Sequence, residues 1–212
     1  MNWIIRTLTC SVGKKLIMAV TGLSFCLFLV SHLAGNLTIF KGPKAFVSYA
    51  ESLHSLGALI LMAELGLLVL AVCHICFGIW LFIGNLTARP VGYAVKKNAG
   101  GRTLSSAIMP YTGLFLLVFI IIHLITFHFA DRGGKDVYYL VHTTFTSPGY
   151  VIFYLIAMIA AAFHVKHGFW SAFQTIGANH PKYMPVIKKV GLVFSLLVGF
   201  GFGCLPIYLS LS

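Results

Sequence analysis

Residues 107–130 read AIMPYTGLFLLVFIIIHLITFHFA, a stretch without a single Lys, Arg, Asp or Glu. A helix needs about 20 consecutive apolar residues to cross the ~30 Å hydrocarbon layer of a membrane. This stretch is long enough, and two histidines, His123 and His128, interrupt its otherwise mostly apolar surface. It therefore predicts a membrane-spanning helix that carries histidine.

Four further stretches have the same length and character, and they cover residues 16–39, 59–83, 150–173 and 190–211. The chain has 212 residues, of which 59% are hydrophobic and 9% are charged. Water-soluble domains carry about 25% charged residues, and disordered chains are poor in apolar residues, so both classes are excluded. The five cysteines are scattered through apolar runs, which excludes a disulfide framework. We expect an all-α integral membrane protein, with residues 1–212 forming one domain of five transmembrane helices.

The basic residues predict the orientation of these helices, because loops on the cytoplasmic side carry the excess of Lys and Arg. One side of the membrane would carry Arg6, Lys14, Lys15, Arg89, Lys96, Lys97, Arg102, Lys182, Lys188 and Lys189. The other side would carry Lys41, Lys44, Arg132 and Lys135. Ten against four places the N-terminus in the cytoplasm and the C-terminus outside. The basic side could also dock an acidic soluble partner.

Histidine is costly inside a membrane unless it has a partner or a task, and this chain has nine histidines against four acids. An internal repeat sorts them. The pattern TGLxxxxFxxxHL occurs twice, and its histidine is His32 in one copy and His123 in the other. The pattern HxxxGxW also occurs twice, starting at His74 and at His164. The two histidines are 42 residues apart in the first copy and 41 in the second, so a two-helix unit is present twice.

Position along the helices pairs these four histidines by depth. His32 and His123 should share one level toward the outer face, and His74 and His164 should share another toward the cytoplasm. At 1.5 Å per residue, the two levels differ by roughly 10–15 Å. Each level then holds two imidazoles on non-adjacent members of a four-helix bundle.

Two imidazoles on facing helices are the axial ligands of a six-coordinate b-type haem, so the four-helix bundle is predicted to hold two b haems. Gly35, Gly78 and Gly168 lie three or four residues after a histidine, where they would leave room for a flat macrocycle. Zinc would need a third or fourth ligand at one level. His167 is the main rival ligand, but only His164 reproduces the repeat. Lys166 and His167 could instead meet the haem propionates or the cytoplasmic interface.

These residues resemble the di-haem cytochrome b membrane anchor of succinate dehydrogenase and quinol:fumarate reductase, in its single-subunit, five-helix cytochrome b558 type. The resemblance rests on Gly13-Lys14-Lys15, Ser31-His32-Leu33 through Gly35-Asn36, the His74 element, His123-Leu124, and Phe163-His164 through Gly168-Phe169-Trp170. It implies that His32 and His123 bind a distal haem and that His74 and His164 bind a proximal one.

The resemblance also implies partners, a location and a second cofactor. An FAD-containing flavoprotein would interconvert succinate and fumarate, and an iron–sulfur subunit would carry electrons to the proximal haem. The chain would act in a bacterial inner membrane, among lipids, on menaquinone or another quinone, and no nucleic acid is expected as a partner. Since it has no FAD or iron–sulfur motif, the dicarboxylate chemistry belongs to the partners.

A quinone near the distal haem needs a group that exchanges protons with its carbonyl oxygens. Glu64 is the sole carboxylate within a span, and it should be buried near the distal level, which would suit it to that role. Alternatively, the Glu64 carboxylate lies near the N-terminus of its helix and is simply stabilised there by the helix dipole. Glu51 and His54, in the outer loop, are the next candidates.

Two other functions fit the same residues. The chain could be the haem b subunit of another membrane dehydrogenase. It could also be a small transporter or channel whose histidines line a path for protons or metal ions. A reduced-minus-oxidised spectrum separates the haem proteins from the transporter.

Overall fold

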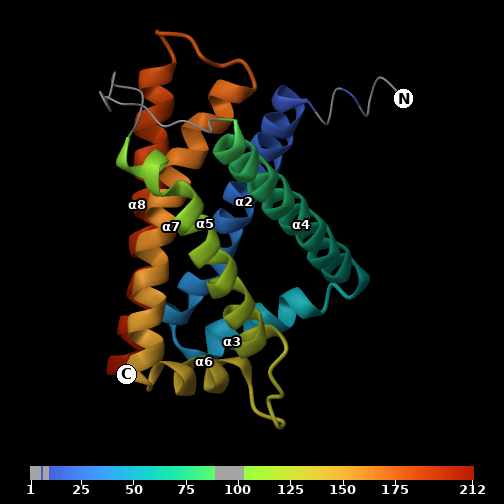
Figure 1. The fold of residues 1–212 in the computed structure, drawn as a ribbon. Helices are drawn as coiled ribbons and strands as arrows, with labels where there is room; N and C mark the ends of the chain where they lie inside the picture. Colours follow the sequence, from blue (N-terminus) through green and yellow to red (C-terminus); the bar gives the residue numbers. More distant parts are fainter. Residues whose placement is uncertain (1–5, 7–9, 89–102) are drawn as a thin grey trace.

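The computed structural model describes residue 6, residues 10–88 and residues 103–212, and most of these residues are helical (Figure 1). Within these described residues, five helices are long and apolar enough to cross a membrane, as the sequence predicts. Their α-helical parts are α2 (Ser11–Asn36), α4 (Ala58–Thr87), α5 (Leu104–His123), α7 (Pro148–Thr175) and α8 (Met184–Leu211). Most of these helices begin or end a few residues beyond the predicted spans. The basic residues predicted at Arg89, Lys96, Lys97 and Arg102 lie outside the described residues.

The segments that follow α2 and η2 contain two helices that the sequence analysis treated as loops. After the short 3-10 turn η1 (Leu37–Lys41), α3 covers Pro43–His54, and α6 covers Val137–Phe145. Pro43 starts α3 at a helical position that needs no backbone N–H. The Asp136 carboxylate accepts a hydrogen bond from the Tyr139 N–H at 2.8 Å and so caps α6. Figure 1 shows both short helices crossing the same end of the molecule, near the C-terminus.

The third span also ends differently from the prediction, which carried it to Ala130. The α-helix stops at His123, and a π-helical turn, η2, covers Leu124–His128. Single π-helical turns in α-helices are frequent at functional sites.

Packing centres on α7, which lies against α2, α5 and α8, whereas α4 lies along α2. The order α4–α2–α7–α5 makes α2 and α5 one diagonal of the four-helix group, and α4 and α7 the other. Figure 1 shows α4 leaning away from the other long helices toward the end that carries α3. None of the residues of α4 is buried within the chain.

Helices α7 and α8 approach closely because small residues line their contact, as is typical of membrane helices. A Cβ at Gly199 of α8 would lie 3.1 Å from Ala162 Cβ of α7, and Gly191 and Gly203 of α8 are buried. Near the C-terminus of the chain, α7 and α8 pack with η1, α3 and α6 in an apolar cluster. That cluster comprises Ile39, Phe46, Phe145, Tyr154, Leu205 and Leu209.

A substitution at Gly191 tests this packing. A Cβ at this position would lie 2.9 Å from Phe169 Cδ1 and 3.4 Å from Phe169 Cβ, so alanine would push the ring out of place. We expect Gly191→Ala to destabilise the chain by about 1–3 kcal/mol and to lower its thermal unfolding midpoint in detergent. Gly66→Ala in α4 is the matched control, because nothing lies within 4 Å of a Cβ there. Equal midpoints for the two variants would contradict this packing.

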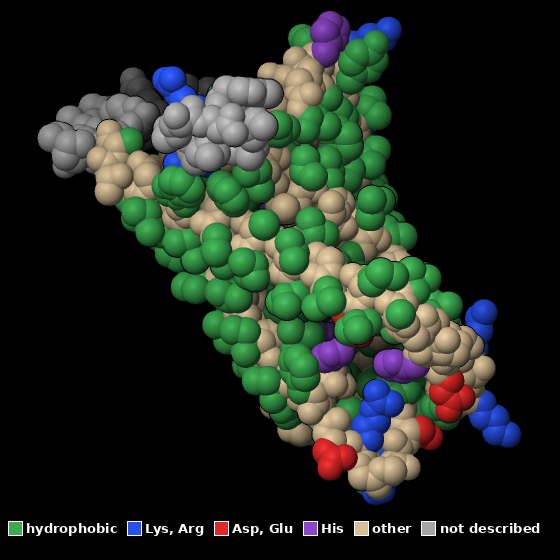
Figure 2. Space-filling view, turned by 90° about the vertical axis from the view of Figure 1, so that its right-hand side faces the viewer, with side chains coloured by type: hydrophobic (Ala, Val, Ile, Leu, Met, Phe, Trp, Pro, Cys, Tyr) green, Lys and Arg blue, Asp and Glu red, His purple; other side chains and the backbone are tan. Residues whose placement is uncertain are grey.

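The surface agrees with a chain surrounded by lipid. Figure 2 shows hydrophobic side chains along the middle of one face, with the charged side chains in view mainly toward its two ends. Large apolar side chains of the spanning helices are exposed, among them Leu27, Leu61, Leu114 and Ile159. Such a surface is stable only where a membrane covers it.

Two pairs of facing histidines as candidate haem sites

The structure brings the four predicted histidines together in two pairs. The ring centroids of His32 and His123 are 6.0 Å apart, and those of His74 and His164 are 6.4 Å apart. The first pair joins α2 to α5, and the second joins α4 to α7, so each pair spans one diagonal of the four-helix group. His167 belongs to neither ring pair and packs its ring edge-on against Trp170, at 5.0 Å between centroids.

These separations suit two ligands on opposite faces of one metal ion. Bonds between a metal ion and an imidazole nitrogen are about 2 Å long, so two rings that share an ion have centroids roughly 6 Å apart. In the described part of the chain, no three or more His, Cys, Asp and Glu side chains gather in a group that could hold a metal ion. Two nitrogen donors alone match axial ligation of a haem, in which the macrocycle supplies the other four donors.

Three of the four rings use Nδ1 in a hydrogen bond. His74 Nδ1 lies 2.9 Å from Thr21 Oγ1, and His164 Nδ1 lies 3.3 Å from Thr112 Oγ1. His123 Nδ1 lies 3.2 Å from the Tyr154 hydroxyl. Among the described residues, none forms a hydrogen bond with Nε2 of these rings, so that nitrogen can bind a ligand. The donor set and its geometry therefore fit haem b.

Apolar aromatic rings surround the pair formed by His32 and His123. Phe28 stacks on His32 at 5.1 Å, and Phe119 stacks on His123 at 5.7 Å. These are the phenylalanines of the repeated pattern, each four residues before its histidine and therefore on the same helix face. Phe202 of α8 lies 5.5 Å from His32. The resulting low polarity is one of the levers by which a protein sets a haem potential.

The vertical spacing of the two pairs follows from the contacts of α2. Thr21 contacts His74, and His32 lies eleven residues further along the same helix. Eleven residues of α-helix rise about 16 Å. Thr112 and His123 have the same spacing in α5. The two levels are therefore about 16 Å apart along these helices, slightly more than the roughly 10–15 Å expected from the sequence.

The three glycines predicted to leave room for a macrocycle have different neighbours in the structure. A Cβ at Gly78 would lie 3.5 Å from Met18 Cε, and one at Gly168 would lie 3.6 Å from Met109 Cε. Both glycines thus face a methionine of the neighbouring helix at ordinary contact distance. A Cβ at Gly35 would lie only 2.6 Å from the ring of Tyr49. The expectation that Gly35 leaves room for a macrocycle is therefore wrong, because α3 fills that space.

The predicted quinone-site residues do not form one cluster. Glu64 Oε1 lies 3.9 Å from His128 Nδ1, and these side chains are 39% and 43% exposed. Glu64 is thus half-exposed within this chain rather than buried as expected. Glu51 and His54 are exposed on α3, and in the described residues no ion pair or hydrogen bond joins them to Glu64 or His128.

Glu64 corresponds to Tyr154 in the two-helix repeat. Each lies ten residues before the histidine of its own helix, His74 in one case and His164 in the other. Tyr154 reaches His123, which pairs with His32. Its equivalent position therefore puts Glu64 at the depth of that pair, on the opposite side of the four-helix group.

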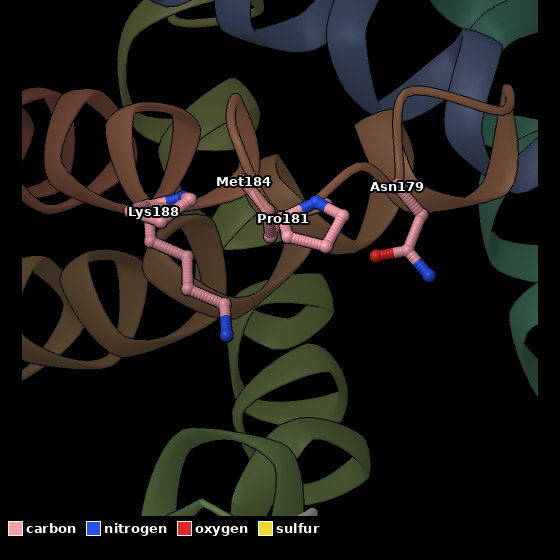
Figure 3. A pocket seen from close by; sticks show the side chains of 5 residues that line it. Asn179, Pro181, Met184 and Lys188 are labelled. Carbon is pink, nitrogen blue, oxygen red and sulfur yellow. The ribbon is translucent and has the colours of Figure 1, made fainter.

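Lys166 lines a hollow of about 520 Å³ at the other end of the molecule, with Lys188, Trp170 and Ser105 among its walls. A second, more open hollow of about 610 Å³ adjoins it where α8 begins. Asn179, Pro181, Met184, Pro185 and Lys188 line this second hollow (Figure 3). None of the four paired histidines lines either one. Of the predicted site residues, Lys166 therefore belongs to this end of the molecule and not to the histidine pairs.

A comparison with known proteins finds a similar membrane subunit. The chain is 24% identical over 177 residues to the succinate dehydrogenase cytochrome b558 subunit of Bacillus subtilis (strain 168), and the match covers 81% of each chain. The resemblance to a cytochrome b558 subunit is confirmed. Five helices able to cross a membrane fit such a subunit. No family profile matches the chain, and no solved structure matches it.

The sequence analysis missed three residues whose hydroxyl groups form hydrogen bonds with the paired histidines. Thr21 and Thr112 belong to the repeated pattern, but the pattern alone assigns them no contact. Tyr154 lies in a helix rich in aromatic residues, and nothing in the sequence distinguishes it from them. The position of the two threonines within the repeat could have identified them. Thr21 and Thr112 occupy the same place in both copies, on the helix that precedes His74 or His164.

Proposed function

We propose that the chain is the membrane anchor of a succinate:quinone oxidoreductase or quinol:fumarate reductase, as a single membrane domain that holds two b haems. The observation that carries this proposal is the presence of two histidine pairs, each about 6 Å between ring centroids, at two levels of one four-helix group. His32 and His123 would hold the distal haem, and His74 and His164 the proximal one. When bound, haem b supplies a one-electron couple at each level.

The role of this chain is then to connect a quinone in the membrane with a soluble iron–sulfur subunit, which in turn contacts a flavoprotein. The dicarboxylate chemistry would take place on the flavoprotein. The basic end supports this arrangement, because Lys15, Lys182, Lys188 and Lys189 are exposed there and can attract an acidic partner. That end would face the cytoplasm of a bacterial inner membrane.

Glu64 and His128 are proposed to handle the protons of the quinone, which is menaquinone or a related compound. Oxidation of a quinol to a quinone releases two protons with two electrons, so a proton acceptor must lie beside the quinone oxygens. The carboxylate and the imidazole lie 3.9 Å apart, half-exposed, between α4 and η2. The equivalence with Tyr154 supports a position at the distal level.

The test is a reduced-minus-oxidised spectrum of the purified complex. We expect b-type Soret and α bands that correspond to two haems per chain, and co-purification with a flavoprotein active on succinate or fumarate. Absence of b-type bands would discard every haem function and leave the histidine-lined transporter. Haem without a succinate- or fumarate-active partner would favour another membrane dehydrogenase.

A further inference from the structure

The repeated Thr-Gly of α2 and α5 contacts the two histidines of one level and not those of the other. Gly22 and Gly113 allow this contact, since a Cβ there would lie 3.4 Å from His74 Cε1 and 3.3 Å from His164 Cε1. The threonine beside each glycine then reaches Nδ1 of the same ring. Two copies of one sequence element thus make the same contact with two different histidines.

The other contacts of the Thr21 hydroxyl indicate the direction of its hydrogen bond with His74. A hydroxyl has one proton to donate. Thr21 Oγ1 lies 2.8 Å from the Ile17 carbonyl oxygen and 3.3 Å from that of Met18, so its proton goes to its own helix. Its lone pairs are then what face His74 Nδ1 at 2.9 Å. With the hydroxyl proton on the helix, the ring donates from Nδ1, and this is the arrangement that the short contact to the Ile17 carbonyl favours.

The second copy leads to the same result. Thr112 Oγ1 lies 3.2 Å from the Ile108 carbonyl oxygen and 3.0 Å from that of Met109. Its lone pairs face His164 Nδ1 at 3.3 Å. Threonines that bond the preceding turn are ordinary in membrane helices. In the described part of the chain, however, only these two also bring their hydroxyl to a histidine ring nitrogen.

A neutral imidazole that carries its proton on Nδ1 has its lone pair on Nε2. An acceptor at Nδ1–H fixes this tautomer and the orientation of the ring, and it strengthens Nε2 as a ligand. We propose that Thr21 and Thr112 are positioning residues, which hold His74 and His164 in the tautomer that presents Nε2 to a metal ion. This inference rests on the proposed haem function.

The other level lacks this device. His123 Nδ1 faces the hydroxyl of Tyr154, which can either donate or accept. No described residue forms a recorded hydrogen bond with a ring nitrogen of His32. Loss of a threonine hydroxyl should therefore affect only the haem of His74 and His164.

The experiment measures the midpoint potentials of both haems in the intact complex by redox titration of the α bands. Thr21→Val and Thr112→Val keep the shape of the side chain but remove the acceptor. Weaker ligands favour the reduced iron, so we expect the potential of the haem held by His74 and His164 to rise. A tenfold change in the ratio of oxidised to reduced haem at a fixed potential corresponds to about 59 mV. The other potential should stay unchanged.

Thr21→Ser and Thr112→Ser keep the hydroxyl and should leave both potentials at their original values. Ser24→Ala removes a hydroxyl that bonds the Val20 carbonyl of the same helix, and it should also change nothing. Loss of the haem in the valine variants with retention in the serine variants would equally support the proposal. Loss in both sets, equal potentials in all variants, or a shift of the other haem would overturn it.

This design separates the two proposals. A wild-type complex without b-type bands would refute the haem function itself. A wild-type complex with two haems, together with valine variants that titrate like it, would refute only the role of Thr21 and Thr112.

Discussion

Replacing His32 or His123 with alanine is expected to remove the distal haem and to leave the proximal one in place. Each histidine supplies one of the two protein ligands at its level, and the ring centroids of this pair are 6.0 Å apart. The other level is about 16 Å away along α2 and uses different side chains. The bound haem should therefore fall from two per chain to one.

The measurement combines haem quantification with a reduced-minus-oxidised spectrum. His32→Ala and His123→Ala should leave the same residual spectrum, and His74→Ala and His164→Ala should leave the complementary one. His142→Ala is the control, because this histidine lies in α6 and stacks on Tyr138. If His32→Ala and His74→Ala gave the same residual spectrum, the pairing would be wrong.

The second large effect is expected at Glu64. Glu64→Gln should keep both haems yet lower the turnover of quinone about 100-fold, because general acid–base groups contribute rate factors of that order. The glutamine has the size of glutamate but cannot accept a proton. Electron transfer from succinate to a soluble artificial acceptor should be unchanged, since that reaction would take place on the proposed partner subunits.

Asp131→Asn is the matched control for this experiment. Asp131 is an acid at the same end of the molecule, and its carboxylate accepts a hydrogen bond from the Gly133 N–H within its own loop. His128→Ala should slow quinone turnover as Glu64→Gln does, because the two side chains face each other at 3.9 Å. Normal turnover in Glu64→Gln would remove Glu64 from the quinone site.

The spanning helices could be predicted because span length and apolar composition follow directly from the thickness of the membrane. The short helices α3 and α6 could not be predicted in the same way. They lie in segments that also hold Gly42, Gly133 and Gly134, whose positive φ angles are typical of turns. A short helix at an interface depends on what it packs against, and Phe46 and Phe145 find their partners only in the assembled cluster.

For the candidate site, the repeat predicts which residues share a depth but not what their side chains contact. That limit explains the outcome at Gly35, where spacing suggested room beside His32 and the structure places Tyr49 of a distant segment. It also explains why Glu64 is half-exposed. Its helix, α4, packs along α2 and buries none of its own residues, a property of tertiary arrangement that hydropathy does not encode.

The two-helix repeat has a consequence for the origin of the molecule. Each histidine pair takes one member from the first copy and one from the second, so a single copy could complete neither pair. Two identical hairpins related by a twofold axis along the membrane normal would complete both at once. Duplication and fusion of such a hairpin would preserve this symmetry in the ligands. Glu64 and Tyr154, which occupy equivalent positions, mark where the two halves have since diverged in chemistry.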